Sequence, residues 1–315
     1  MTSYSYNLGI LDERFTILGE LGDGGYAKVY KVKDPKTNEE YAAKVVQRFC
    51  QNEFKVNSKL SNLKNPYIIK YISFSQGSIK LDNYVDDCKP YFLFELATKG
   101  DLSKYINCGR GGFKESHCKL IFQDILNGIQ VIHKANICHR DIKTQNILLD
   151  SDNFNIKICD FGFSSDSTEL LTGCFGTKEF MAPEIIIGNE YDGIKADIFS
   201  LGVLLLNLRT SKFLFEKAKG LPYDYIKKND KLIWTLGEVN GISGLSKEFK
   251  ELYLKMVAFN PKERPNIEDI LNCEWLKEIN DLSEDDRGKL RREVIKEFQL
   301  REEIILSAKD YKEYH

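Results

Sequence analysis

A stretch in the middle of the chain combines acidic, basic and amide side chains at a spacing that could support chemistry. It reads HRDIKTQN over residues 139–146, and DFG follows at residues 160–162. Two short apolar runs lie between these motifs, separated by a segment rich in Asp, Asn and Ser. Apolar runs divided by such turn residues are typical of a β-hairpin. The sequence therefore predicts a hairpin with polar groups at both of its open ends.

The residue types at these ends suit phosphate chemistry. Asp141, Lys143 and Asn146 lie on the loop that enters the hairpin, and Asp160 lies at its exit. A hairpin brings its two ends to one edge, so one cation and three oxygen-bearing groups should converge there. Mg²⁺ prefers oxygen ligands and is usually held by one or two carboxylates plus substrate phosphates. Asn146 and Asp160 could supply such ligands, and Asp141 remains to accept a hydroxyl proton.

The two motifs, in this order, resemble the catalytic signature of the eukaryotic protein-kinase superfamily. Lys143, two residues after Asp141, and the segment from Gly176 to Glu184, GTKEFMAPE, resemble the serine/threonine type. The resemblance covers about residues 14–276. It implies an α+β, bilobal protein-kinase-like fold, with a small antiparallel β-sheet N-lobe containing one main helix and a larger, mostly helical C-lobe.

The resemblance also divides the chain. It implies an N-terminal lead-in over 1–13, an N-lobe over 14–96 and a C-lobe over 97–276. The remaining residues, 277–315, form a charged amphipathic helical tail. We expect the polar lead-in to be loose and the polar stretch from Ser75 to Pro90 to form a long hairpin loop.

A glycine-rich segment joins two strand-like runs near the N-terminus. Glycine has no Cβ, so backbone N–H groups in such a turn can approach phosphates closely. The kinase phosphate loop would be formed by Leu21, Gly22, Asp23, Gly24 and Gly25. Alanine stands at position 27, where the family has its third glycine, and a simple hairpin turn is the alternative interpretation.

Lys44 lies in an otherwise apolar strand, where a buried ammonium group is costly unless it is paired. Glu53 is the only acidic residue between Lys44 and Asp82, and it falls on a predicted helix over about 50–63. We expect a Lys44–Glu53 ion pair, with Phe54 on the inner side of the helix. In kinases the lysine also binds the α- and β-phosphates. A solvated Glu53 is the alternative, because Glu53 lies further from Pro66 than the family pattern has it.

Further nucleotide contacts follow from the resemblance by position alone. A bulky residue would close the back of the adenine pocket, two hinge residues would bond the adenine edge through their backbones, and one carboxylate would bind the ribose. Three apolar side chains would sandwich the ring. In that order these residues are Phe94; Glu95 and Ala97; Asp101; and Val29, Ala42 and Leu148.

The segment after Asp160 resembles the kinase activation segment. In this interpretation Thr177 holds Asp141 and Lys143 in place and is not itself a switch. Arg140 could pair with a phosphate on the segment, since an Arg–phosphate pair is bidentate and can order a loop. Thr172 is the candidate phosphosite, with Ser167 and Thr168 as competitors. Structural roles are implied for Asp197, which would brace the catalytic loop, and for an Arg264–Glu184 ion pair.

The tail leaves three interpretations open. Leu290, Val294, Phe298 and Ile305 form an apolar stripe on a charged helix. The helix could pack on the C-lobe or lead into a further region, act as an autoinhibitory or calmodulin-type segment, or bind a regulatory partner or a second copy. Calmodulin targets are usually basic, whereas this tail mixes both signs of charge.

Composition excludes several other classes. The formal net charge is −2 and the pI is about 6.2, so no basic footprint indicates nucleic acid. No apolar run approaches the roughly 18 residues that would span a bilayer, so we expect no membrane partner. Eight cysteines without a CxxC pair indicate neither a zinc module nor a disulfide framework. Reduced thiols suggest a cytoplasmic protein, with the nucleus as the alternative.

The expected reaction moves the γ-phosphoryl group of ATP, with Mg²⁺, to Ser or Thr hydroxyls of protein substrates. The alternative is a kinase-shaped scaffold with weak or no catalysis, which predicts loss of at least one essential residue. All four are present: Lys44, Asp141, Asn146 and Asp160. The acceptor motif is open, although Asp101 allows a weak preference for upstream Arg. The late C-lobe and tail faintly resemble the calcium/calmodulin-dependent group.

Overall fold

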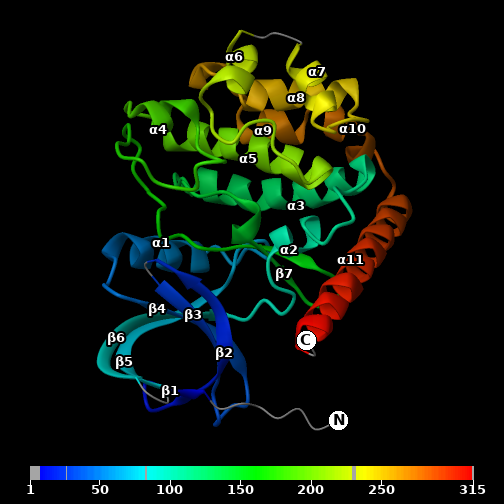
Figure 1. Ribbon diagram of the computed structural model, residues 1–315. Helices are drawn as coiled ribbons and strands as arrows, with labels where there is room; N and C mark the ends of the chain where they lie inside the picture. The colour runs from blue at the N-terminus through cyan, green and yellow to red at the C-terminus, as the bar shows by residue number, and fades with distance from the viewer. Residues whose placement is uncertain (1–7, 26, 82–83, 229–231, 314–315) are drawn as a thin grey trace. The chain divides into compact units, whose positions relative to one another are not determined.

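The computed structural model describes residues 8–25, 27–81, 84–228 and 232–313 (Figure 1). Contacts divide the chain into two compact units, Met1–Thr98 and Lys99–His315. Among its described residues the first contains an antiparallel sheet and one helix, and the second is mostly helical. The predicted fold class, a small sheet lobe and a larger helical lobe, is therefore confirmed.

The first unit is built on one sheet in which every pairing is antiparallel. Its strand order is β1-β2-β3-β4-β6-β5, and β1 also pairs with β5, so the two ends of the sheet are joined. The strands are β1 (Gly9–Leu11), β2 (Phe15–Gly24), β3 (Ala27–Lys33), β4 (Glu40–Val46), β5 (Tyr71–Leu81) and β6 (Tyr84–Glu95).

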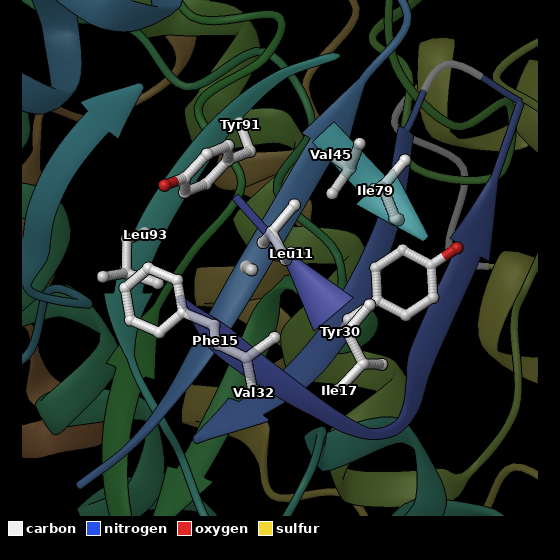
Figure 2. Packing of buried hydrophobic residues seen from close by; sticks show 10 residues of the cluster. Leu11, Phe15, Ile17, Tyr30, Val32, Val45, Ile79, Tyr91 and Leu93 are labelled. Atoms are coloured by element: carbon white, nitrogen blue, oxygen red, sulfur yellow. The ribbon is translucent and has the colours of Figure 1, made fainter. Parts of the chain in front are cut away.

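Apolar side chains from all six strands pack together inside the sheet (Figure 2). Leu11 of β1 is fully buried and lies among Phe15, Tyr30 and Ile79. The prediction of a loose lead-in is therefore wrong for Gly9–Leu11, while residues 1–7 lie outside the described part. The reason is hydrophobic: Leu11 fills the core, and the backbone of β1 bonds two neighbouring strands.

The expected long loop between the last two strands is also wrong. β5 and β6 continue through most of the polar stretch, and their register runs from Tyr71↔Phe94 to Leu81↔Tyr84. Ile79 is buried in the core, whereas Gln76, Lys80 and Asp87 of the same hairpin are exposed. The polar side chains thus line the solvent face of a half-buried hairpin, where alternation of buried and exposed residues is normal.

The helix of the first unit, α1 (Gln51–Ser61), buries one face through Val56 and Leu60. Phe54 is 37% exposed, so its predicted place on the inner side is wrong. Its ring contacts Phe74 edge-on at the surface, with ring centroids 5.7 Å apart. Glu53, in the first turn of the helix, is buried instead, because it forms an ion pair with Lys44.

The second unit contains ten α-helices and one two-stranded sheet among its described residues. The long helix α3 (Glu115–Lys134) and the apolar helix α5 (Gly193–Thr210) are almost fully buried. The shorter helices are α2 (Leu102–Ile106), α4 (Pro183–Ile187), α6 (Leu221–Lys227), α7 (Leu232–Val239), α8 (Lys247–Met256), α9 (Ile267–Leu271) and α10 (Glu274–Asn280). Within the described ranges, no helix combines the length and apolar character that crossing a membrane requires.

An internal ion pair fixes this helical unit. Arg264 is fully buried and makes a bidentate bond to Glu184, with Nη1–Oε1 at 2.6 Å and Nη2–Oε2 at 2.7 Å. Its guanidinium also donates to the carbonyl oxygens of Ala258 and Lys195 and lies over the Phe199 ring. The predicted pair is confirmed, and it is saturated with hydrogen bonds, as a buried charge must be.

The tail forms the 30-residue helix α11 (Glu284–Glu313), which packs against α2 and α3 (red in Figure 1). Val294 and Phe298 of the predicted stripe are buried, so packing on the helical unit is the interpretation that the structure supports. His117 of α3 is buried beside this helix, 3.7 Å from Glu293. Burial and the nearby Lys114 lower the pKa of His117, against opposing effects of two tail glutamates, Glu293 and Glu297.

Candidate active site

The predicted hairpin is present. β7 (Ile147–Asp150) pairs with β8 (Asn155–Ile158) from Ile147↔Ile158 to Asp150↔Asn155. At its open end the Cys159 amide donates to the Asn146 carbonyl at 3.0 Å. This bond fixes the entry and the exit of the hairpin side by side, so the two motifs that flank it meet at one edge.

Asp141 is the centre of a hydrogen-bonded group on the entering loop. Its side chain is 3% exposed, and Lys143 Nζ lies 2.7 Å from Oδ2. The Thr177 hydroxyl donates to Asp141 Oδ1 at 2.8 Å and accepts from Lys143 Nζ at 2.8 Å. A carboxylate, an ammonium and a hydroxyl thus form a closed triangle. Thr177 contacts both Asp141 and Lys143, as expected.

The Asn146 amide is oriented by the same carboxylate. Nδ2 donates to the Asp141 carbonyl at 2.8 Å and to Asp141 Oδ2 at 3.2 Å. Because Nδ2 is engaged, Oδ1 is the atom of Asn146 that could ligate a cation. Asp160, at the hairpin exit, is exposed and has a left-handed φ of 65°. Backbone strain of this kind in a non-glycine residue is common at functional sites.

Asp197 of α5 braces the catalytic loop from inside. Its Oδ2 accepts from the His139 amide at 2.7 Å, and its Oδ1 accepts from the Arg140 amide at 2.8 Å. Arg140 has a left-handed φ of 69°, so these bonds hold a strained turn. His133 Nε2 lies 3.0 Å from the same carboxylate. Sequence reasoning missed this link, because nothing in the pattern of α3 distinguishes His133 from an ordinary core histidine.

Arg140 is held by aromatic rings. Its Nε donates to the Tyr191 hydroxyl at 3.0 Å, and its guanidinium lies 4.5 Å from the Phe175 ring centroid. Burial raises the pKa of Tyr191, although Arg140 opposes the shift. Thr172 is exposed, and its neighbour Leu171 pairs with Tyr191 through the backbone. No sequence signal marked Phe175 or Tyr191 as partners of Arg140.

In the first unit, the Lys44–Glu53 ion pair is present, with Nζ–Oε1 at 2.6 Å. Lys44 stands in β4 opposite Val29 of β3 and Phe92 of β6. Both side chains of the ion pair are mostly buried, which explains why Glu53 turns inward in the first turn of α1. Asn57, one helical turn later, bonds the Glu53 carbonyl at 2.9 Å and adds to the order of this turn.

The glycine-rich segment forms the β2–β3 connection. Gly22 pairs with Val29, and Gly24 pairs with Ala27. Leu21, Gly22, Asp23, Gly24 and Gly25 are exposed. The hinge-side positions belong to the same sheet, since Ala42 of β4 stands opposite Phe94 of β6, and Glu95 stands opposite Tyr41. Ala97 is partly buried and follows the end of β6.

In the second unit, Asp101 and Leu148 are brought together. A backbone bridge joins Asp101 to Leu148, and the Lys99 amide donates to the Leu149 carbonyl at 2.9 Å. Asp101 is the N-cap residue of α2, and its carboxylate lies 3.2 Å from Lys104 Nζ. The predicted ribose carboxylate and the predicted adenine-contacting leucine are therefore neighbours.

Comparison with known proteins agrees with this geometry. The protein kinase domain family matches residues 15–276. Relatives include "Serine/threonine-protein kinase SRK2A" of Physcomitrium patens, 29% identical over 269 residues, which are 84% of this chain and 74% of the relative. "Serine/threonine-protein kinase SRK2C" of Arabidopsis thaliana is 29% identical over 266 residues, 84% of this chain and 75% of the relative. With this match and the catalytic loop around Asp141, the chain belongs to the protein kinase family.

Proposed function

We propose that this protein is a serine/threonine protein kinase that transfers the γ-phosphoryl group of Mg-ATP to Ser and Thr hydroxyls of protein substrates. The observation that supports this most directly is the triangle formed by Asp141, Lys143 and Thr177. It presents a fixed carboxylate beside a fixed ammonium, which suits a hydroxyl nucleophile and a phosphoryl group that must be neutralised.

Each member of the triangle has a distinct task in the proposed reaction. Asp141 orients the attacking hydroxyl and accepts its proton through a carboxylate oxygen. Lys143 offsets negative charge on the transferred group, and Thr177 keeps both side chains in place. Phosphoryl transfer passes through a loose transition state, so positioning and electrostatic stabilisation are the main contributions that a protein can make.

The donor set at the hairpin end fits Mg²⁺. Asn146 Oδ1 and the Asp160 carboxylate are hard oxygen ligands, and two protein ligands suffice for an ion that keeps waters and substrate phosphates in its shell. When bound, the ion shields charge on the β- and γ-phosphate oxygens. The bond from Nδ2 to Asp141 fixes the orientation of the Asn146 amide, which leaves its oxygen free to ligate the ion.

We assign Lys44 to the α- and β-phosphates, with Glu53 holding its ammonium group in place. The exposed glycine-rich segment is assigned to the phosphates as well. The adenine and ribose positions follow the family pattern: Phe94, Glu95, Ala97, Val29, Ala42, Leu148 and Asp101. Support for this set comes from the paired positions of Ala42 and Phe94 in the sheet, and from the bridge that joins Asp101 to Leu148.

Serine and threonine are the proposed acceptors for two reasons. Lys143 and Thr177 are the residues that distinguish the serine/threonine type in the family pattern, and they contact each other here. The relatives are also named serine/threonine-protein kinases. Thr172 remains the proposed phosphosite on the segment, because it is exposed and its neighbour pairs with Tyr191, a partner of Arg140.

The test is phosphoryl transfer from γ-labelled ATP to peptides that differ only in a Ser, Thr or Tyr acceptor. We expect transfer to Ser and Thr, and Asp141→Asn should lower kcat by about 10²–10⁴-fold while ATP binding remains. Asp285→Asn, which makes the same chemical change at an exposed position of α11, is the matched control. Nucleotide binding without transfer by the unsubstituted protein would instead indicate a kinase-shaped scaffold.

A further inference from the structure

Arg301, near the middle of the tail helix α11, has an unusual environment for a charged residue in a terminal segment. It is 1% exposed, and its guanidinium donates to the carbonyl oxygens of Tyr105, Gly111 and Gly112. Glu297, one turn earlier on the same helix, accepts from Nε at 2.8 Å and neutralises the charge. A buried charge without partners would be very costly, so this set of partners makes Arg301 a specific contact between the tail helix and the rest of the helical unit.

A second contact lies one turn earlier on the same face. The Phe298 ring is 1% exposed and packs against Tyr105, Phe113 and Phe154, with ring centroids 5.0–5.4 Å apart. Tyr105 is the residue that joins both contacts, because its carbonyl accepts from Arg301 while its ring touches Phe298. The tail helix therefore fixes the C-terminal half of α2.

From α2 the contacts lead to the segment that contains the proposed ribose carboxylate. The Tyr105 hydroxyl donates to the Lys99 carbonyl at 3.0 Å, and Glu302 of the tail lies 3.2 Å from Lys99 Nζ. On its other side the same segment is bonded to β7, where Leu149 donates to the Gly100 carbonyl at 2.8 Å. The segment 99–101 is thus held by α11 through Tyr105 and Glu302, and by β7 through its backbone.

We propose that α11 is a fixed part of the nucleotide site, in which Arg301 and Phe298 are positioning residues for Asp101. This inference rests on the proposed function, because it needs Asp101 to bind ribose. Loss of the guanidinium takes one donor away from each of three carbonyl oxygens, and loss of the Phe298 ring leaves a gap beneath Tyr105. Either change lets α2 shift, and Asp101, as its N-cap residue, shifts with it.

The same contacts argue against the two other interpretations of the tail. An autoinhibitory or partner-binding helix needs its apolar stripe for the site or partner that it binds. Here Val294 and Phe298 are already buried within the helical unit, and Arg301 satisfies backbone groups of that unit. Release of the helix from the helical unit would break the hydrogen bonds of Arg301 and expose the buried apolar side chains, which costs free energy. A helix that stays in place and positions Asp101 avoids this cost.

The test measures how strongly the protein distinguishes ATP from 2′,3′-dideoxy-ATP, which lacks both ribose hydroxyls. Calorimetric Kd values for both nucleotides, with Mg²⁺, are compared for the full chain and for the variants Arg301→Lys and Phe298→Ala. Arg292→Ala removes an exposed arginine of the same helix and serves as the matched control. Thermal unfolding of each variant establishes that it is folded at the assay temperature.

We expect the unsubstituted protein to bind ATP about tenfold more tightly than the dideoxy analogue, the scale of a hydrogen bond to a charged group. Arg301→Lys and Phe298→Ala should bring this ratio towards one, and combining either with Asp101→Ala should add little further loss. Glu302→Gln changes a partly exposed ion pair, which contributes little to stability, and a smaller fall, about twofold, is expected.

Two results would overturn the inference. An unchanged ratio in folded Arg301→Lys and Glu302→Gln proteins would mean that the tail does not position Asp101. A higher kcat in Phe298→Ala would indicate that the helix inhibits the enzyme. A different result, no ATP binding by the unsubstituted protein, would contradict the proposed function and, with it, this inference.

Discussion

Thr177 offers a precise test of how the catalytic loop is held. Its hydroxyl bonds both Asp141 and Lys143 at 2.8 Å, and Thr177→Val removes only that hydroxyl while keeping the branched shape. Hydrogen bonds to charged groups contribute about 1.5–3 kcal/mol each. The direct contact between Lys143 and Asp141 remains, and water can reach the partly exposed Thr177, so the two losses are not fully additive.

We therefore expect Thr177→Val to raise the barrier to transfer by about 2–3 kcal/mol, which lowers kcat by about 30–150-fold. The physical cause is misplacement: without the Thr177 hydroxyl, Oδ1 of Asp141 loses a donor and the carboxylate is held less tightly. Small errors in the position of a catalytic group can cost about 10²-fold. Because the variant leaves the nucleotide contacts intact, the KM for ATP should change by less than about threefold.

The assay is single-turnover and steady-state transfer to a Ser peptide, with thermal unfolding measured in parallel. Thr177→Ser retains the hydroxyl and is the matched control, for which kcat should stay within about threefold of the unsubstituted protein. If Thr177→Val turned over as fast as Thr177→Ser, the triangle would have no role in the chemical step and the reasoning would fail.

Three further predictions concern the ion pairs and a buried histidine. Glu53→Gln should raise the KM for ATP about tenfold through loss of order at Lys44, measured by steady-state kinetics; an unchanged KM would contradict this. Arg264→Ala should lower the unfolding free energy by about 3–5 kcal/mol in urea titrations, because Glu184 is left buried and unpaired, whereas a loss below about 1 kcal/mol would refute that view. Burial lowers the pKa of His117 below its ordinary value of 6.5, so the folded state binds fewer protons and stability should fall as pH drops below that value. His117→Asn should flatten this fall, by up to about 1.4 kcal/mol per pH unit, in urea titrations at several pH values; equal slopes would exclude the histidine as its cause.

The parts of the site that sequence reasoning predicted are those whose geometry is local. Asp141, Lys143 and Asn146 are separated by a few residues, and a hairpin necessarily places Asp160 beside them. The Lys44–Glu53 pair follows from elimination, since a buried lysine needs an acid and the neighbouring sequence offers one. The short loops around a hairpin and the need of a buried charge for a partner can both be recognised in the sequence.

The parts that sequence reasoning missed depend on contacts between distant segments. Leu11 looks like an ordinary residue of a polar lead-in until the sheet that buries it is known. The helical pattern predicts Phe54 on the inner side of α1, but the residue lies at the surface, where its ring contacts Phe74. His133 and Arg301 act through partners that lie 64 and more than 180 positions away in the chain, and no local pattern encodes such distances.

Strand β1 has a practical consequence for anyone who prepares this protein. A recombinant fragment trimmed to the family match, residues 15–276, would lose Gly9–Leu11 and leave β2 and β5 each with a bare backbone edge. Bare edges recruit strands from other molecules and promote aggregation. The same trimming would strip α11 from the rings of Phe113 and Phe154. Insolubility of such a fragment would then result from the loss of β1 and α11, and it would carry no information about the catalytic residues.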